Sequence, residues 1–316
     1  MPRARLAAVA LIATSALSAC GSKDSVAPQP PTWSKLTALA GGGFGIARTS
    51  DGHLLTTLID YGFVERVLLS NAGASHEGLQ LGGTPSVVAT SPDGATFYVA
   101  NMAGWVEARD AGTGTQTAYA SVSDAHALTV APDGNRVYVA GSAGHVYVMS
   151  SGLSLLSTIA LPGGPWGMAF RDLGGSSRLY VSARDGGTIT EIDRSTNTVL
   201  RVFNVGGRPH GLVMTADGRL FAADNQQSVV KIIDAGTGIV TKSIPFTGAF
   251  GLAITPDEKT IYVSGDQGDV GIISVSSSSV VRTWPTGGQA RQIVTSADGS
   301  TAWFANSAGW IDVVTR

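Results

Sequence analysis

One short phrase recurs along this chain: an apolar stretch, an Asp-Gly or related turn, and a strand-like segment with an aromatic residue near its middle. The turns are marked by seven aspartates, of which Asp172 stands in the most degenerate copy: Asp51, Asp93, Asp133, Asp172, Asp217, Asp257 and Asp298. Successive aspartates are 42, 40, 39, 45, 40 and 41 residues apart. A period near forty with four strand-sized segments per copy is typical of propeller blades, which bury their faces only against neighbouring copies.

The segment after each turn carries an aromatic column, whose predicted role is packing between blades. Its members are Tyr98, Tyr138, Tyr180, Phe221, Tyr262 and Trp303. We therefore expect an all-β fold, a seven-bladed β-propeller of four-stranded antiparallel blades. The last copy ends soon after its third strand, and residues 32–39 lead into the first copy as outer strands lead into the others. The N-terminal strand is expected to close the ring by joining the C-terminal blade.

The first nineteen residues have the pattern of an export signal, with Arg3 and Arg5 before an apolar run over residues 6–17. The tetrapeptide that ends at Cys20, Leu-Ser-Ala-Cys, resembles the lipobox of bacterial lipoproteins. That resemblance implies cleavage before Cys20 and lipidation of its thiol, hence an exported lipoprotein of the cell envelope, at the outer membrane in a Gram-negative cell. An ordinary cleaved signal with an incidental cysteine is the alternative. Cys20 is the only cysteine, so it has no partner for an internal disulfide.

Three parts are thus expected along the chain. Residues 1–19 are a signal peptide, residues 20–31 are a lipidated cysteine and a flexible, proline-containing tether, and residues 32–316 are the propeller. The net charge of −2 and the absence of a basic run argue against a nucleic-acid partner. The expected partners are the membrane, through the lipid, and an unknown protein or small molecule, with the protein itself a monomer.

When the seven copies are aligned, one position has no common residue type. It lies seven residues before each turn aspartate, or six in the fourth copy, and contains Phe44, Ser86, His126, Trp166, His210, Phe250 and Arg291. These residues should converge on the mouth of the central channel as a ligand-binding ring, since aromatic, histidine and arginine side chains suit a planar group or an anion. A second ring is expected nearby, from Asn101, Asp224, Asp266 and Asn306, with His145 and Arg184 further out. The alternative is a plug whose polar atoms bond to loops and water.

Residues 98–101, Tyr-Val-Ala-Asn, resemble the strand motif of the YVTN family of β-propeller repeats, and the likeness extends over residues 32–316. It implies the fold and no particular chemistry. Residues 209–211 and 217–224 also resemble repeats of the SMP-30/gluconolactonase and streptogramin-lyase propellers.

Hydrolases of the gluconolactonase type hold a divalent cation with a Glu at an inner-strand entrance, and no such entrance here carries Glu or Asp. Asp224, Asn101 and His210 are the weak candidates for metal ligands. We therefore predict no cofactor and a non-catalytic binding or scaffolding module. The alternative is a metal-dependent hydrolase, lactonase-like, or a lyase that acts through His126, His210, Asp224 and Arg291.

Overall fold

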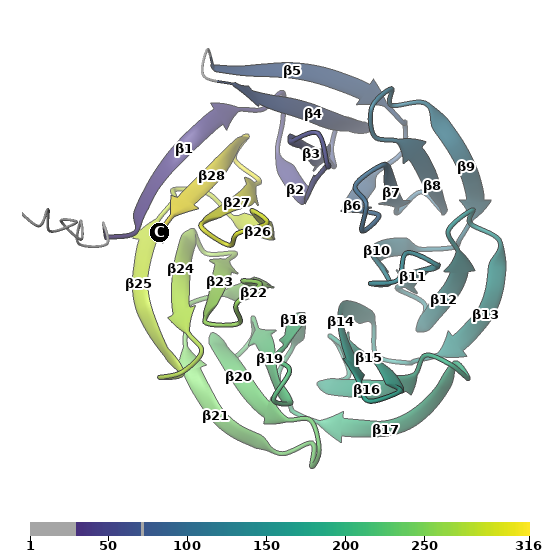
Figure 1. Cartoon of the computed structure of the whole chain (residues 1–316), viewed down its shortest axis with the longest axis vertical. Helices are drawn as coiled ribbons and strands as arrows, with labels where there is room; N and C mark the ends of the chain where they lie inside the picture. Colours follow the sequence, from purple (N-terminus) through teal and green to yellow (C-terminus); the bar gives the residue numbers. More distant parts are fainter. Residues whose placement is uncertain (1–29, 71–72) are drawn as a thin grey trace, which may run out of the picture. The chain divides into compact units, whose positions relative to one another are not determined.

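The strands form a closed ring of blades around a central channel (Figure 1). The structure, a computed structural model, describes residues 30–70 and 73–316, and within these ranges it contains strands and turns but no helix. The described strands form seven four-stranded antiparallel sheets. The predicted seven-bladed β-propeller is therefore confirmed. We number blades 1 to 7 from the sheet that contains β2.

Within each blade the four strands lie side by side in order from the channel outward. The innermost strands are β2 (Gly43–Arg48), β6 (Pro85–Thr90), β10 (Ala125–Val130), β14 (Pro165–Leu173), β18 (Pro209–Met214), β22 (Ala249–Ile254) and β26 (Ala290–Thr295). The second strands are β3 (His53–Leu58), β7 (Thr96–Asn101), β11 (Arg136–Gly141), β15 (Ser176–Ala183), β19 (Arg219–Asp224), β23 (Thr260–Gly265) and β27 (Thr301–Asn306).

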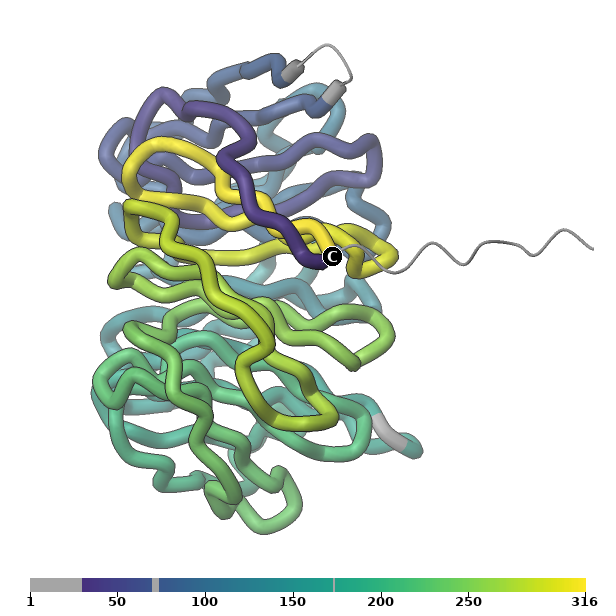
Figure 2. Tube along the Cα trace, turned by 90° about the vertical axis from the view of Figure 1, so that its left-hand side faces the viewer, coloured from purple at the N-terminus to yellow at the C-terminus, as the bar shows by residue number. Residues whose placement is uncertain are grey.

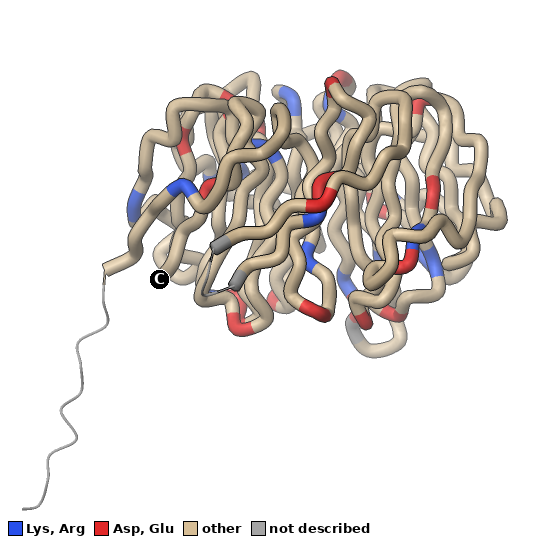
Figure 3. The backbone as a smooth tube through the Cα atoms, turned by 90° about the horizontal axis from the view of Figure 1, so that it is seen from above, with Lys and Arg blue, Asp and Glu red and all other residues tan. Residues whose placement is uncertain are grey.

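The two outer positions follow the same order. The third strands are β4 (Phe63–Ser70), β8 (Trp105–Asp110), β12 (His145–Ser150), β16 (Thr188–Asp193), β20 (Val229–Asp234), β24 (Asp269–Ser274) and β28 (Trp310–Thr315). The outermost strands are β5 (Gly73–Gln80), β9 (Gln116–Ser121), β13 (Leu155–Ala160), β17 (Thr198–Asn204), β21 (Val240–Pro245), β25 (Ser279–Pro285) and β1 (Thr32–Ala38). Charged residues are scattered thinly over this frame, and several Asp and Glu positions lie on its turns (Figure 3).

The aromatic column on the second strands lies between blades, as predicted. All six members are buried. Tyr98 of blade 2 packs in one cluster with Val137 and Val139 of blade 3, and its hydroxyl donates to the Ser151 carbonyl at 2.9 Å. The hydroxyl of Tyr262 likewise donates to the next blade, to Gly299 O at 3.1 Å. Each blade thus uses its neighbour to bury its own aromatic residue.

The turn aspartates shape the hairpins between first and second strands. Asp93 accepts hydrogen bonds from the hydroxyl of Ser91 and the main-chain N–H of Ala95, and Gly94 adopts the positive φ of +67° that the turn needs. The fourth copy differs from this pattern.

In blade 4 the turn is not at Asp172, because β14 continues to Leu173. The chain reverses at Gly174 and Gly175, whose φ angles of +53° and +86° favour glycine. Asp172 instead forms an ion pair with the buried guanidinium of Arg194 at 2.8 Å. This longer hairpin explains the degenerate spacing of the fourth copy.

The ring closes through the amino-terminal strand, as expected from the sequence. Strand β1 pairs antiparallel with β28, from Thr32 opposite Thr315 to Ala38 opposite Trp310. Figure 2 shows the purple first strand beside the yellow last ones.

A buried carboxylate lies beneath this seam. The indole N–H groups of Trp33 and Trp310 donate to Asp312 Oδ1 at 3.2 and 3.0 Å, and Asn306 Nδ2 donates to Oδ2 at 2.7 Å. Burial raises the pKa of Asp312 despite these bonds. One side chain therefore joins three strands of the closing blade.

Residues 31–316 form one compact unit. The expected signal peptide, Cys20 and most of the expected tether lie outside the described residues. No helix in the part of the chain that the structure describes is long and apolar enough to cross a membrane.

We expect Asp312→Ala to lower the free energy of unfolding by about 2 kcal/mol, because it leaves the Asn306 amide and two indole N–H groups without their acceptor. Urea unfolding followed by tryptophan fluorescence measures the change. Asp60→Ala, at an exposed position, is the matched control and should shift the midpoint little. Equal midpoints for the two variants would show that the seam does not depend on Asp312.

Candidate ligand-binding site at the channel mouth

The seven residues of the chemically variable column each occupy the second position of an innermost strand. We call them the mouth ring: Phe44, Ser86, His126, Trp166, His210, Phe250 and Arg291. In every blade the pairing of the first and second strands shifts register at this position. Such bulges re-aim a side chain relative to a regular strand. The sequence located the position but not the bulge.

Three aromatic rings of the mouth ring meet across the channel, and we call them the aromatic plug. Phe44 of blade 1, Trp166 of blade 4 and Phe250 of blade 6 contact one another with centroid distances of 6.2, 6.1 and 6.2 Å and interplanar angles of 72 to 82°. Edge-to-face contacts of this kind are favourable because the positive edge of one ring meets the negative face of another. The structure therefore brings together residues that lie up to 206 positions apart in the chain.

Two histidines pack against the plug. The ring of His126 lies 4.7 Å from that of Trp166, and His210 lies 4.9 Å from Phe250. Both nitrogens of His126 contact main-chain oxygens, Nδ1 that of Asp124 at 3.1 Å and Nε2 that of Pro165 at 2.7 Å. The Nδ1 atom of His210 lies 2.9 Å from Arg208 O.

Burial lowers the pKa of both rings, that of His210 to about 4. The positive charges of Arg184 and Arg208 also disfavour protonation of His210. Both imidazoles are therefore neutral at pH 7.

Two guanidinium groups lie over the plug. That of Arg291 is 5.0 Å from the Phe250 ring and 5.7 Å from Phe44, and that of Arg184 is 5.0 Å from Trp166. Burial lowers the pKa of Arg291, and the carboxylate of Asp266 opposes that effect. Arginine remains charged at neutral pH, so the mouth combines π faces with positive charge.

Hydroxyl groups hold the mouth ring from the neighbouring blade. Ser182 of blade 4 donates to His210 O at 2.7 Å, Ser264 donates to Arg291 O at 2.5 Å, and Ser86 donates to His126 O at 2.8 Å. Ser86 is thus buried in a bridge between blades and does not join the plug. Sequence reasoning missed this bridge, although a hydroxyl near the end of the second strand in some copies was its signal.

Most residues of the expected second ring form hydrogen bonds with the main chain of neighbouring loops. Asn101 Oδ1 accepts from the main-chain N–H groups of Thr84 and Ala103 at 2.8 and 3.0 Å. Asn306 has the same role toward Ala308, at 3.0 Å.

Asp224 also lies inside the protein, since its side chain is fully buried. It forms an ion pair with Lys231 at 2.5 Å and accepts from the main-chain N–H groups of Arg208 and Gln227. Among the expected second ring, Asp266 is the member that keeps partial exposure. His145 packs on Tyr147 of its own strand, with 6.0 Å between ring centroids.

In the described ranges, 30–70 and 73–316, no group of three or more His, Cys, Asp or Glu residues is arranged to hold a metal ion.

The neutral state of His210 predicts acid sensitivity. In the unfolded chain a histidine has a pKa of about 6.5, so between pH 6.5 and 4 the unfolded state binds more protons and the free energy of unfolding falls as the pH falls. Relative to wild type, His210→Asn, whose amide N–H replaces the Nδ1 donor, should lose about 3 kcal/mol less between pH 7 and 4. Urea unfolding at both pH values measures this, with His145→Asn as the matched control. Identical losses in wild type and His210→Asn would contradict it.

Comparisons with known proteins agree with the fold and leave the chemistry open. No family model matches the chain. Two relatives named "Uncharacterized protein YncE", from Salmonella typhimurium and Salmonella typhi, are each 28% identical to it over 137 residues, 41% of this chain and 38% of theirs. The match therefore spans about two fifths of these relatives. Among solved structures, the WD40 β-propeller domain of Doa1 superposes with a TM-score of 0.79 at 13% identity, over 90% of this chain and 97% of that one, which supports the fold alone.

Proposed function

We propose that this protein is an envelope-anchored lipoprotein whose propeller is a non-catalytic binding or scaffolding module, and that it engages its ligand or partner through the mouth ring. The observation that carries this proposal is the aromatic plug beneath the guanidinium groups of Arg184 and Arg291. Aromatic and arginine side chains supply most of the binding free energy at recognition surfaces. A partner with an anionic group beside an apolar or planar one fits this chemistry.

The contacts that His126 and Asp224 already make within the protein favour a binding function over a catalytic one. The His126 nitrogens both contact main-chain oxygens, and the Asp224 carboxylate is committed to Lys231 and to two main-chain N–H groups. A general base or a metal ligand needs a lone pair directed at its substrate or ion. Metal analysis of the purified protein tests the alternative: a stoichiometric divalent ion lost in His210→Asn would favour a hydrolase or lyase.

Partner capture should depend on the mouth face. We expect Arg291→Gln and Trp166→Ala each to weaken capture of the bound component from envelope extract by at least about 30-fold, the effect of removing a residue worth about 2 kcal/mol. Quantitative pull-down with immobilised protein measures this, and melting temperatures identify variants that fail to fold. Asn135→Ala, exposed on the turn after β10 at the opposite end of the blade, is the control and should capture normally. If both mouth variants capture as wild type does, the site lies elsewhere.

Membrane anchorage should depend on Cys20. Wild-type protein expressed in a bacterial host should incorporate labelled fatty acid and sediment with membranes, because several acyl chains hold a protein firmly to a bilayer. Cys20→Ser removes the acceptor thiol, so the variant should carry no label and appear in the soluble fraction. An unlabelled wild type would favour the ordinary signal peptide, and label retained in Cys20→Ser would show that the lipid is attached to another residue.

A further inference from the structure

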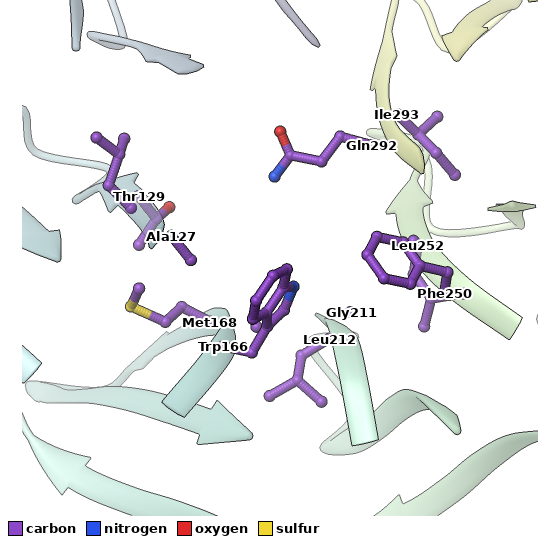
Figure 4. Close-up of a pocket in the computed structure, with 13 residues that line it drawn as sticks. Ala127, Thr129, Trp166, Met168, Gly211, Leu212, Phe250, Leu252, Gln292 and Ile293 are labelled. Carbon is purple, nitrogen blue, oxygen red and sulfur yellow. The ribbon is translucent and has the colours of Figure 1, made fainter. Parts of the chain in front are cut away.

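The central channel contains a cavity directly beneath the aromatic plug, which we call the chamber. Its volume is about 160 Å³, and the inner strands of blades 3 to 7 line it. Trp166 and Phe250 form its mouth end, and Met168 and Leu252 are among its apolar walls (Figure 4). Leu128 lines it as well. The plug therefore has two sides, one toward the mouth face and one toward this space.

The chamber also has an unsatisfied polar group. Gln292 extends from β26 into the chamber, which is partly open (Figure 4), and its Oε1 atom is buried without a hydrogen-bond partner among the described residues. A buried amide group without a partner costs about 1 to 3 kcal/mol, so such a group marks the place of a missing hydrogen bond. If the amide is turned, Nε2 takes that place and needs an acceptor instead.

Main-chain N–H and C=O groups of the innermost strands also face the channel. Each innermost strand is the edge of its sheet, so it has no strand on its channel side to pair with its N–H and C=O groups. Gly167, Gly211 and Gly251 line the chamber and have no side chain to cover this edge. The N–H groups of Gly167 and Gly251 already donate to the hydroxyls of Ser182 and Ser264, at 2.8 and 2.9 Å, so the Gln292 amide is the polar group that an occupant has to satisfy.

The occupant's charge and size can be inferred from the lining. None of the residues that line the chamber is charged, and a charge taken from water into such a space would have nothing to pair with. A cavity of about 150 Å³ in another protein holds one benzene molecule. The chamber therefore fits a neutral ring of six atoms.

We propose that the chamber is a binding site for a small, neutral, planar molecule that carries a hydroxyl group, with phenol as its simplest representative. The ring packs against Trp166 and the leucine and methionine walls, and the hydroxyl bonds to the Gln292 amide. A hydroxyl can donate to Oε1 or accept from Nε2, so it satisfies either orientation of the amide. This site goes beyond the proposed capture at the mouth face and does not depend on it.

Calorimetric titration of the whole protein with phenol tests the proposal, with toluene, which has nearly the same shape and no hydroxyl, as competitor. We expect one phenol per chain. Gln292→Met keeps the length of the side chain and removes the amide, so it should weaken phenol binding about tenfold and change toluene binding less than about twofold. Gln116→Met, the same substitution on the exposed strand β9, should leave both affinities unchanged.

A crystal structure of the wild-type protein with saturating phenol gives a readout that needs no variant. Phenol density beside Gln292 supports the proposal. Density for water alone in the chamber, no saturable phenol binding, or equal weakening by Gln292→Met and Gln116→Met would each overturn it.

Discussion

The structure depends on the fact that a blade cannot bury its two faces alone. The aromatic column is buried only because Tyr98, Tyr262 and their counterparts pack on the following blade, which supplies main-chain acceptors for the hydroxyls of these two tyrosines. A ring of such blades has no stable open form, since an open end would expose one complete apolar face. The pairing of β1 with β28 is therefore the condition for the other six blades to be buried, and not a local detail of blade 7.

The same dependence between blades positions the mouth ring. The glycine after Trp166 has no side chain, and a Cβ atom at Gly167 would lie 2.0 Å from His210 O, so only glycine lets the two inner strands approach this closely. Ser182 then bonds to that same carbonyl oxygen. The backbone of the mouth residue is thus held by the preceding blade, while its side chain is free to differ. This explains how one position can vary chemically within a rigid repeat.

The sequence predicted the features that depend on the repeat period and failed where an individual blade departs from it. The forty-residue spacing predicted the propeller fold, the strand that closes the ring and the position of the mouth residue in each copy, because all three follow from counting strands and turns along the repeat. It misplaced the fourth turn, since two glycines after Asp172 lengthen that hairpin. It placed Asn101, Asp224 and Asn306 at the correct strand ends, but could not show that their polar atoms turn back to bond with loops. Nor could it predict the chamber, which depends on how Gln292 and Trp166 project across the channel.

The two interpretations of the mouth ring, a plug or a recognition site, describe different faces of one cluster. The Ser86 hydroxyl donates to the main chain, and both His126 nitrogens lie against main-chain oxygens, one of which accepts the single N–H of the neutral ring, as a plug requires. Arg184 and Arg291 have their guanidinium groups over the rings; that of Arg184 is ion-paired with Asp185 at 3.2 Å, whereas that of Arg291 donates to the neutral amide of Gln289 and has the more available charge. A rigid, closed plug favours recognition, because its side chains lose little conformational freedom when a partner binds. The plug also lies between the mouth face and the chamber, so the two proposed sites, one for an anionic group and one for a neutral molecule, are on opposite sides of it.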